Sequence, residues 1–295
     1  MDIRFSKDHH YRLIDESKIE TDLSVIYKGQ DLELSRTVCV KSIQLDCQNP
    51  NQVKPKLNRA MLEVKTMVRV GEKTSRVPRI YSTYFDETSL TLYIIMQWID
   101  GTSLEKKMNV PELMFIRWMI DLCDILAIME RERLYHKDIK PSNIMINRRN
   151  ELYLIDFNIS VSKPNMIEGT VNYKPPEMDM NSKYVGREKV DIFSIGVMLY
   201  EYYAKEVPKR GFDYAKNSRR GKLAWDVFKE PISKNLQTPR EVNNIVIKCM
   251  KMDPRERYRN ISELKRDLIQ AERSIKKHAR NQYKQDKPIQ GGVQD

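Results

Sequence analysis

The chain has 295 residues, of which 40% are hydrophobic and 32% are charged, and its formal net charge at pH 7 is +11. This is enough for one large domain or two lobes with a core, and no apolar run approaches the roughly 20 residues that span a bilayer. The N-terminus is too polar for a secretory signal peptide. We therefore expect a protein with no membrane span and a cytoplasmic location.

The positive charge has two interpretations, a nucleic-acid site or a solvated basic surface. Basic residues are spread among 41 acidic residues, and the densest basic run, residues 273–287, lies near the polar C-terminus. Because no basic segment is interleaved with aromatic residues, a nucleic-acid partner is not expected. Four scattered cysteines lack metal-ligand spacing and are interpreted as buried or unreactive thiols: Cys39, Cys47, Cys123 and Cys249.

The first hundred residues have the pattern of a small antiparallel sheet with one helix. Residues 48–55 are polar and contain two prolines, which predicts a loop, and residues 57–70 have apolar positions at helical spacing. Short apolar runs predict strands at residues 25–27, 38–43, 79–85 and 90–98. We therefore expect a β-rich N-terminal lobe over residues 11–99, preceded by an extension over residues 1–10.

The pattern changes to a helical one after Asp100 and Gly101. Pro111 is well placed in the first turn of a helix that runs to about Arg133. A buried helix is predicted at residues 190–203, and amphipathic helices are predicted at residues 240–252 and 261–275. We expect a mostly helical lobe over residues 100–280 and a disordered polar tail over residues 281–295.

Two short motifs carry the strongest chemical signal, YHKDIKPSN at residues 135–143 and LIDFN at residues 154–158. The first resembles the catalytic loop of protein kinases, H-R-D-x-x-x-x-N, and the second resembles the D-F-G metal-binding turn that follows it. Phosphoryl transfer needs in-line positioning, metal ions and a group that accepts the proton of the attacking hydroxyl. Asp138, Asn143 and Asp156 are residue types that meet these needs.

Three further motifs occur in the order found in protein kinases: GTVNYKPPE at residues 169–177, KVDIFSIG at residues 189–196 and DPRER at residues 253–257. Together with the two motifs above, they make the chain similar to a eukaryotic-type Ser/Thr protein kinase domain over roughly residues 11–272. The resemblance implies an α+β, bilobal protein kinase-like fold. Its N-lobe would be β-rich with one regulatory helix, and its C-lobe would be mostly helical.

The resemblance also implies catalytic and metal-binding roles. Asp138 would orient the attacking hydroxyl as the catalytic base, and Lys140 would neutralise the γ-phosphate as charge shifts. Asn143 and Asp156 would hold Mg²⁺, a hard cation that prefers oxygen ligands, so the cofactors implied are ATP and Mg²⁺. Lys140 and residues 170–177 favour protein substrates with Ser or Thr hydroxyls over small-molecule substrates.

The nucleotide would be held mainly by the first lobe. Lys41, in VCVK, matches the lysine that contacts the α- and β-phosphates, and Glu63 matches its ion-pair partner. Loss of this pair is expected to loosen ATP positioning more than it changes folding. The hinge between the lobes, with Met96, Gln97 and Trp98, would contact adenine, and Met96 would be the gatekeeper. Cys39 and Met145 would sandwich the ring from above and below.

Other matched positions imply structural roles. Thr170 would lie beside Asp138, as in Ser/Thr-specific kinases, and Glu177 would pair with Arg257. Asp191, at a helix start, would support the catalytic loop.

The chain departs from the family pattern in its nucleotide loop. The three glycine positions of the Gly-rich loop fall on Ile19, Thr21 and Ser24, so residues 19–24 contain no glycine, and side chains there predict weaker nucleotide binding. Asn158 replaces the glycine after Asp-Phe, a milder change because asparagine tolerates the left-handed conformation.

A second departure concerns regulation. Lys137 replaces the arginine that receives an activation-loop phosphate in many kinases, and the loop over residues 156–177 is short. We therefore expect weak or absent switching by phosphorylation.

The sequence favours an active Mg-ATP-dependent Ser/Thr protein kinase. The alternative is a pseudokinase or nucleotide-binding scaffold with little or no phosphotransfer, which the glycine-free loop supports. The oligomeric state does not follow from the sequence.

Overall fold

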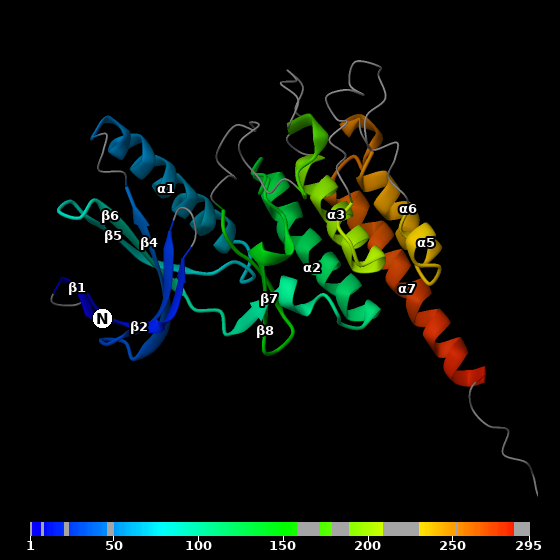
Figure 1. Cartoon of the computed structure of the whole chain (residues 1–295), viewed down its shortest axis with the longest axis horizontal. Helices are drawn as coiled ribbons and strands as arrows, with labels where there is room; N and C mark the ends of the chain where they lie inside the picture. The colour runs from blue at the N-terminus through cyan, green and yellow to red at the C-terminus, as the bar shows by residue number, and fades with distance from the viewer. Residues whose placement is uncertain are drawn as a thin grey trace, which may run out of the picture. The chain divides into compact units, whose positions relative to one another are not determined.

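The computed structural model describes residues 2–6, 9–20, 24–45, 50–157, 172–178, 189–208, 230–251 and 253–285. The chain forms two compact units. The first contains residues 1–106 and 128–169, and the second contains residues 107–127 and 170–295. Figure 1 shows the strands gathered in the first unit and most of the helices in the second.

A six-stranded antiparallel sheet dominates the first unit, with strand order β1-β2-β3-β4-β6-β5. Its strands are β1 (Asp2–Ser6), β2 (His9–Glu20), β3 (Val25–Asp31), β4 (Arg36–Gln44), β5 (Ile80–Asp86) and β6 (Thr91–Gln97). All four strands predicted between residues 25 and 98 are confirmed. The strand β1, in the predicted N-terminal extension, was not expected.

The helix α1 (Pro50–Gly71) packs beside this sheet and starts earlier than predicted. The predicted loop over residues 48–55 is wrong from Pro50 onward. Pro50 is tolerated because first-turn N–H groups have no intrahelical acceptor, whereas Pro55, in the second turn, gives up one backbone hydrogen bond. The helix buries one face, formed by Ala60, Val64, Met67 and Val70.

Aromatic side chains join the two edge strands of the sheet. Phe5, on the edge strand β1, stacks on Tyr84 of the opposite edge strand β5, with ring centroids 4.1 Å apart and an interplanar angle of 3°. The Phe5 ring also lies 5.0 Å from that of Tyr93 on β6. This aromatic contact covers a buried core of Tyr11, Leu13, Val38, Val40 and Ile95.

Phe5→Ala should lower the free energy of unfolding by about 1–3 kcal/mol, because it removes one stacked and two tilted aromatic contacts together with buried area. Urea unfolding followed by fluorescence measures this loss. Arg4→Ala, at an exposed neighbouring position on β1, is the matched control and should have little effect. Equal stability of the two variants would show that β1 adds nothing to the sheet.

The first unit contains a second, three-stranded sheet, whose last two strands connect the two chemical motifs along the chain. It consists of β7 (Gly101–Ser103), β8 (Ile144–Asn147) and β9 (Leu152–Leu154), in that order. These strands lie in the part of the chain predicted to be mostly helical. They are short, so their apolar residues gave no period that would distinguish them from buried turns.

The second unit is helical, as predicted. Its helices are α2 (Glu112–Arg131, whose last residues belong to the first unit), α3 (Val190–Ala204), α5 (Pro231–Lys234), α6 (Arg240–Cys249) and α7 (Ile261–Gln285). The short 3₁₀ turns of this unit are η3 (Pro176–Met178) and η6 (Pro254–Glu256). In the first unit and at its boundary, the short 3₁₀ turns are η2 (Pro141–Asn143) and η1 (Leu104–Lys107). At Gly196 of α3, a β-carbon would lie 2.5 Å from that of Cys249, so glycine permits the close contact with α6.

The helix α7 extends beyond the apolar stripe that predicted it. It continues to Gln285, into the segment expected to be a disordered tail. The residues after Ile275 are mostly Lys, Arg, Gln and Ala, which favour a helix even without an apolar stripe in the sequence.

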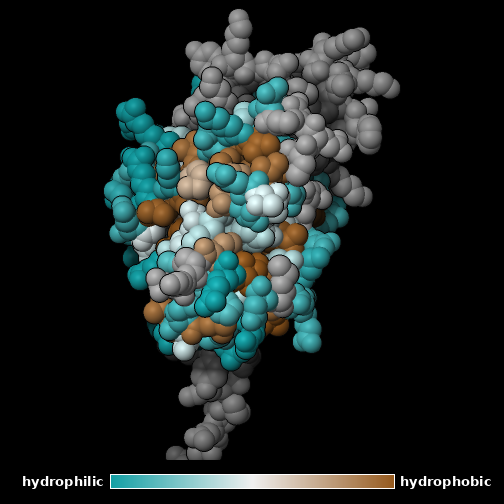
Figure 2. Space-filling view, turned by 90° about the vertical axis from the view of Figure 1, so that its left-hand side faces the viewer, coloured by the Kyte–Doolittle hydropathy of each residue, from teal (hydrophilic) through white to brown (hydrophobic). Residues whose placement is uncertain are grey.

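The arrangement of a sheet-rich first unit and a helical second unit confirms the predicted α+β class. Within the described ranges, no helix is both long and apolar enough to cross a membrane. Figure 2, which views the side of the molecule that is on the left in Figure 1, shows apolar residues in several patches among hydrophilic ones.

Candidate active site

A buried ion pair connects the sheet to α1. Lys41 on β4 donates from Nζ to Oε1 of Glu63 on α1 over 3.0 Å. Nζ also lies 3.6 Å from Oδ1 of Asp156. The structure thus brings together three of the predicted site residues, and two of them are largely shielded from water, since Lys41 and Glu63 are 5% and 3% exposed.

Burial and charge act in opposite directions on this pair. Burial by itself would lower the pKa of Lys41, but the carboxylates of Glu63 and Asp156 outweigh it and raise this pKa above its ordinary value. Lys41 is therefore a charged ammonium group. Burial raises the pKa of Glu63, an effect that Lys41 opposes.

The predicted catalytic loop forms a compact hydrogen-bonded cluster. Nζ of Lys140 lies 3.0 Å from Oδ2 of Asp138. The side-chain amide of Asn143 donates to the backbone carbonyl of Asp138 over 2.9 Å and to its Oδ2 over 3.0 Å. These contacts fix the orientation of the Asp138 carboxylate. The turn η2 closes the loop, because Pro141 fits its first position and the N–H of Asn143 donates to the carbonyl of Lys140.

The two chemical motifs are held next to each other by backbone contacts. The N–H of Ile155 donates to the carbonyl of Asn143 over 3.0 Å, so Asp156 follows directly on a residue bonded to the catalytic loop. The pairing of β8 with β9 continues this contact, with Ile144 opposite Leu154.

His136 is a site residue whose role the sequence analysis did not assign. Its side chain is fully buried, and Nε2 lies 3.1 Å from the carbonyl oxygen of Ile155. Its ring makes an edge contact with Phe157, with centroids 5.1 Å apart. His136 therefore contacts both neighbours of Asp156, the backbone of Ile155 and the ring of Phe157. The histidine of the first motif and the phenylalanine of the second were visible in the sequence, but not their contact.

Two site residues have left-handed backbone conformations. Lys137, just before Asp138, has φ 67°, and Asp156 has φ 62°. Such conformations are unfavourable for residues other than glycine and are found disproportionately at functional sites. Lys137 is also 4% exposed. This burial keeps Lys137 from acting as an exposed charge.

The oxygen donors near Asp138 fit a hard divalent cation. The amide nitrogen of Asn143 is used by Asp138, which leaves its side-chain oxygen as a potential ligand. The Asp156 side chain is 37% exposed and supplies carboxylate oxygens. Among the described residues, no group of three His, Cys, Asp or Glu side chains could hold a metal ion. A cation here would thus share its coordination with phosphate oxygens and water, as is usual for Mg²⁺.

The residues predicted to contact adenine lie on three strands, β4, β6 and β8, and on the segment that follows β6. Cys39 on β4 faces Met96 on β6 in the sheet register, and Met145 lies on β8. Burial raises the pKa of the Cys39 thiol to about 12, so it is neutral and behaves as an apolar side chain. Gln97 already donates its backbone N–H to the carbonyl of Arg79, so an adenine contact at Gln97 would use its carbonyl. The Trp98 ring lies 5.5 Å from Nζ of Lys28.

The glycine-free nucleotide loop is described at its two ends. Ile19 and Glu20 pair with Ile26 and Val25, after a shift in the β2–β3 register between Ile14 and Ile19, and Ser24 is buried. Residues 21–23 lie outside the described residues. The same holds for Asn158 and for the predicted contact of Thr170 with Asp138.

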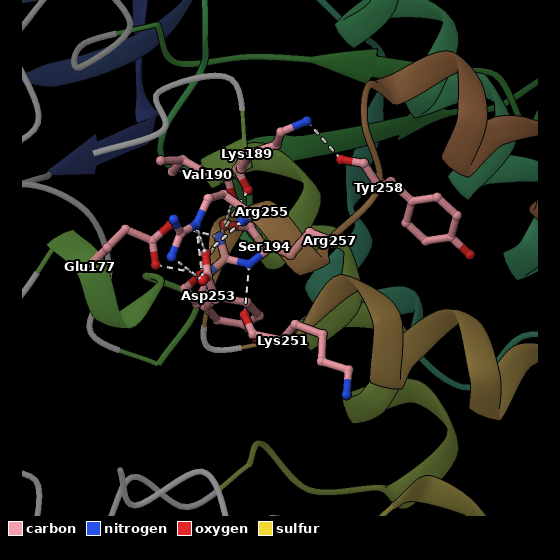
Figure 3. Close-up of polar contacts among 10 residues, drawn as sticks. Glu177, Lys189, Val190, Ser194, Lys251, Asp253, Arg255, Arg257 and Tyr258 are labelled. Carbon is pink, nitrogen blue, oxygen red and sulfur yellow. Dashed lines mark hydrogen bonds and ion pairs between the residues drawn. The ribbon is translucent and has the colours of Figure 1, made fainter. Parts of the chain in front are cut away.

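The second unit contains a cluster of polar contacts around the buried Arg257, shown in Figure 3. Arg257 donates from both terminal nitrogens to Glu177, over 2.6 and 2.7 Å, as the sequence predicted. Its Nε donates to the carbonyl of Lys251 over 2.8 Å, and its guanidinium lies 4.8 Å from the Phe193 ring. Asp191 is also buried in this unit. Its predicted support of the catalytic loop remains a prediction.

Comparison with known proteins gives a consistent result. Residues 20–269 match the protein kinase domain family. Serine/threonine-protein kinase PknB of Mycobacterium leprae is 26% identical over 265 residues, and serine/threonine-protein kinase PrkC of Bacillus subtilis is 24% identical over 259 residues. These matches cover 84% and 82% of this chain, but 40% and 38% of the relatives. The chain therefore spans about two fifths of the length of these curated relatives.

The family match covers most of the chain, including both chemical motifs and the Glu177–Arg257 pair. It also agrees with a sheet-rich unit followed by a helical one. The chain belongs to the protein kinase domain family.

Proposed function

We propose that this chain transfers the γ-phosphoryl group of Mg-ATP to serine and threonine hydroxyls of protein substrates. The observation that carries the proposal is the cluster of Asp138, Lys140 and Asn143, held by hydrogen bonds beside the segment that carries Asp156. The Ser/Thr-kinase names of the relatives support the choice of acceptor.

Each residue has a chemical task in this proposal. Bound Mg-ATP supplies the phosphoryl group, held by Lys41 and, through the metal, by Asn143 and Asp156. Asp138 orients the acceptor hydroxyl and takes its proton. Lys140 balances negative charge that develops on the transferred group, and Glu63 keeps Lys41 in position.

Incubation of the chain with labelled ATP, Mg²⁺ and a generic basic protein tests the proposal. We expect label on serine and threonine, and none when Mg²⁺ is removed by a chelator. Label on neither acceptor nor enzyme, in a preparation that still binds ATP, would contradict phosphotransfer.

That last outcome would instead support the second candidate function, a nucleotide-binding scaffold. The absence of glycine from residues 19–24 favours this candidate, because side chains there restrict the approach of the backbone to phosphate. An ATP-dependent rise in melting temperature without transfer would identify it.

Activity should not require phosphorylation of residues 156–177. Lys137 is buried, so it is not an accessible partner for a phosphate on this segment. An exposed pair elsewhere would contribute only about 0–1 kcal/mol, whereas a strongly biased loop needs several kcal/mol to change state. Phosphatase-treated enzyme should keep most of its initial rate. The double variant Ser160→Ala/Ser162→Ala, at positions outside the described residues, should match the parent. A large loss of rate that autophosphorylation restores would reveal a phosphorylation switch.

A further inference from the structure

The first unit contains a groove that the proposed catalysis does not use, although two of its lining residues, Gln97 and Trp98, belong to the predicted adenine-contact set. A cavity of about 800 Å³ lies between the C-terminal part of α1 and the start of β5. A second cavity of about 290 Å³ lies against Ile99, Asp100 and the turn after β8. Both are lined by Gln97 and Tyr153, so they adjoin at these two residues, and the two cavities together are called the groove.

The groove has an apolar part in its larger cavity. Met67 and Val77 are buried there, while Val68 remains 42% exposed. Tyr81 and Tyr153 are half-buried and also line it. The Tyr81 ring is fixed from one side by the guanidinium of Arg36, 3.7 Å from the ring centroid. An occupant could therefore bury an apolar side chain in this cavity.

The charged residues of the groove are mostly basic. Its lining contains four cationic side chains and two carboxylates: Lys73, Arg79, Arg148 and Arg149, with Glu72 and Asp100. Two cations are already used, because Lys73 lies 2.6 Å from Glu132 and Arg148 lies 2.9 Å from Asp100.

Arg79 and Arg149 differ from these two. Both are exposed, and neither side chain has an ion-pair or hydrogen-bond partner among the described residues. Glu72 is likewise unpaired within the described ranges, so the unpaired charge of the groove is positive overall. A third donor lies beside the groove, since Nη1 of Arg76 is buried without a hydrogen-bond partner in the described structure.

We propose that this groove binds an acidic peptide segment that carries a large apolar side chain. Arg79 lines one cavity and Arg149 the other, so a single small anion would not engage both. An extended segment can place carboxylates at both points, where guanidinium groups bind them with paired hydrogen bonds, and an apolar side chain between them. If the proposed function is correct, the segment belongs to a protein substrate and holds it close to the site.

A labelled peptide with Glu-Asp pairs on either side of Leu-Phe is the direct probe, with fluorescence anisotropy as the measurement. We expect binding that weakens with salt, and none for a matched peptide in which lysine replaces every acidic residue. Arg79→Glu/Arg149→Glu should weaken binding at least about tenfold. Val68→Asp should also weaken it. Arg4→Glu, which changes an exposed arginine on β1, is the matched control and should bind as the parent does.

Several results would overturn this inference. They are absence of peptide binding, equal affinity for the parent and the double arginine variant, equal binding of the lysine peptide, and binding of phosphatidylserine vesicles in place of the peptide. Because these measurements need no catalysis, they stand even if phosphotransfer fails. If transfer to the generic basic protein is intact and the peptide does not bind, only the groove assignment fails.

A kinetic arm tests the link to catalysis. Joining the acidic segment to a serine-containing acceptor should lower the KM of that acceptor with little change in kcat. The double variant should lose this KM advantage while it phosphorylates the unjoined acceptor normally. An unchanged KM for the joined acceptor, with the peptide bound, would mean that the groove does not serve substrates.

Discussion

Asp138→Ala should remove nearly all phosphoryl transfer while nucleotide affinity remains close to that of the parent. Proton transfer by a positioned side chain contributes a factor of roughly 10² to 10⁴ to the rate. Asp138 has the position for this task, because Lys140 and Asn143 both contact its carboxylate. Initial rates with labelled ATP measure the first effect, and a titration with a fluorescent nucleotide measures the second.

The Asp138→Asn variant separates chemistry from structure. It has nearly the same shape as the parent side chain but cannot accept a proton, so we expect the same loss of rate with unchanged stability. Asp124→Ala, at an exposed aspartate of α2, is the matched control. Turnover near the parental rate in either Asp138 variant would remove Asp138 from its proposed role.

Lys41→Met should cause both loss of transfer and a large loss of stability, about 3–5 kcal/mol in the free energy of unfolding. The sequence suggested that losing the ion pair would affect ATP positioning more than folding. The burial of the pair changes this expectation, because Glu63 would be left as an uncompensated carboxylate in the interior, close to Asp156. Urea unfolding measures the stability, and single-turnover transfer measures the chemistry.

The double variant Lys41→Met/Glu63→Leu tests that explanation. It removes both buried charges, so it should be more stable than Lys41→Met alone while remaining inactive. Lys73→Met, at an exposed lysine paired with Glu132, is the control and should change stability far less. If the losses of stability in Lys41→Met and in Glu63→Leu alone simply add in the double variant, the pair is not coupled as proposed.

Local sequence patterns were sufficient for most of the secondary structure and for the choice of candidate residues. Strands β3 to β6 alternate or cluster their apolar residues, and α3 is apolar on all sides. Each of these elements can therefore be recognised from a few consecutive residues. The spacing from Asp138 to Asn143 is also local, because one short turn, η2, sets the distance between them. Predictions failed where a local preference was overridden, as at Pro50, or where favourable helix formers continued a helix beyond its apolar stripe, as in α7.

The sequence by itself determined the kinase resemblance, the order of the elements and the identity of Lys41, Glu63, Asp138, Asn143 and Asp156. Only the tertiary structure decided how these residues are placed: the burial of Lys41 against Glu63, the contact of His136 with the Ile155 carbonyl, and the stacking of Phe5 on Tyr84 between opposite edges of one sheet. It also decided the groove that contains Arg79 and Arg149. The physical reason is that each of these features joins segments distant in the chain. Their solvent exposure and geometry depend on how the sheet curls and the helix packs, which no local period records.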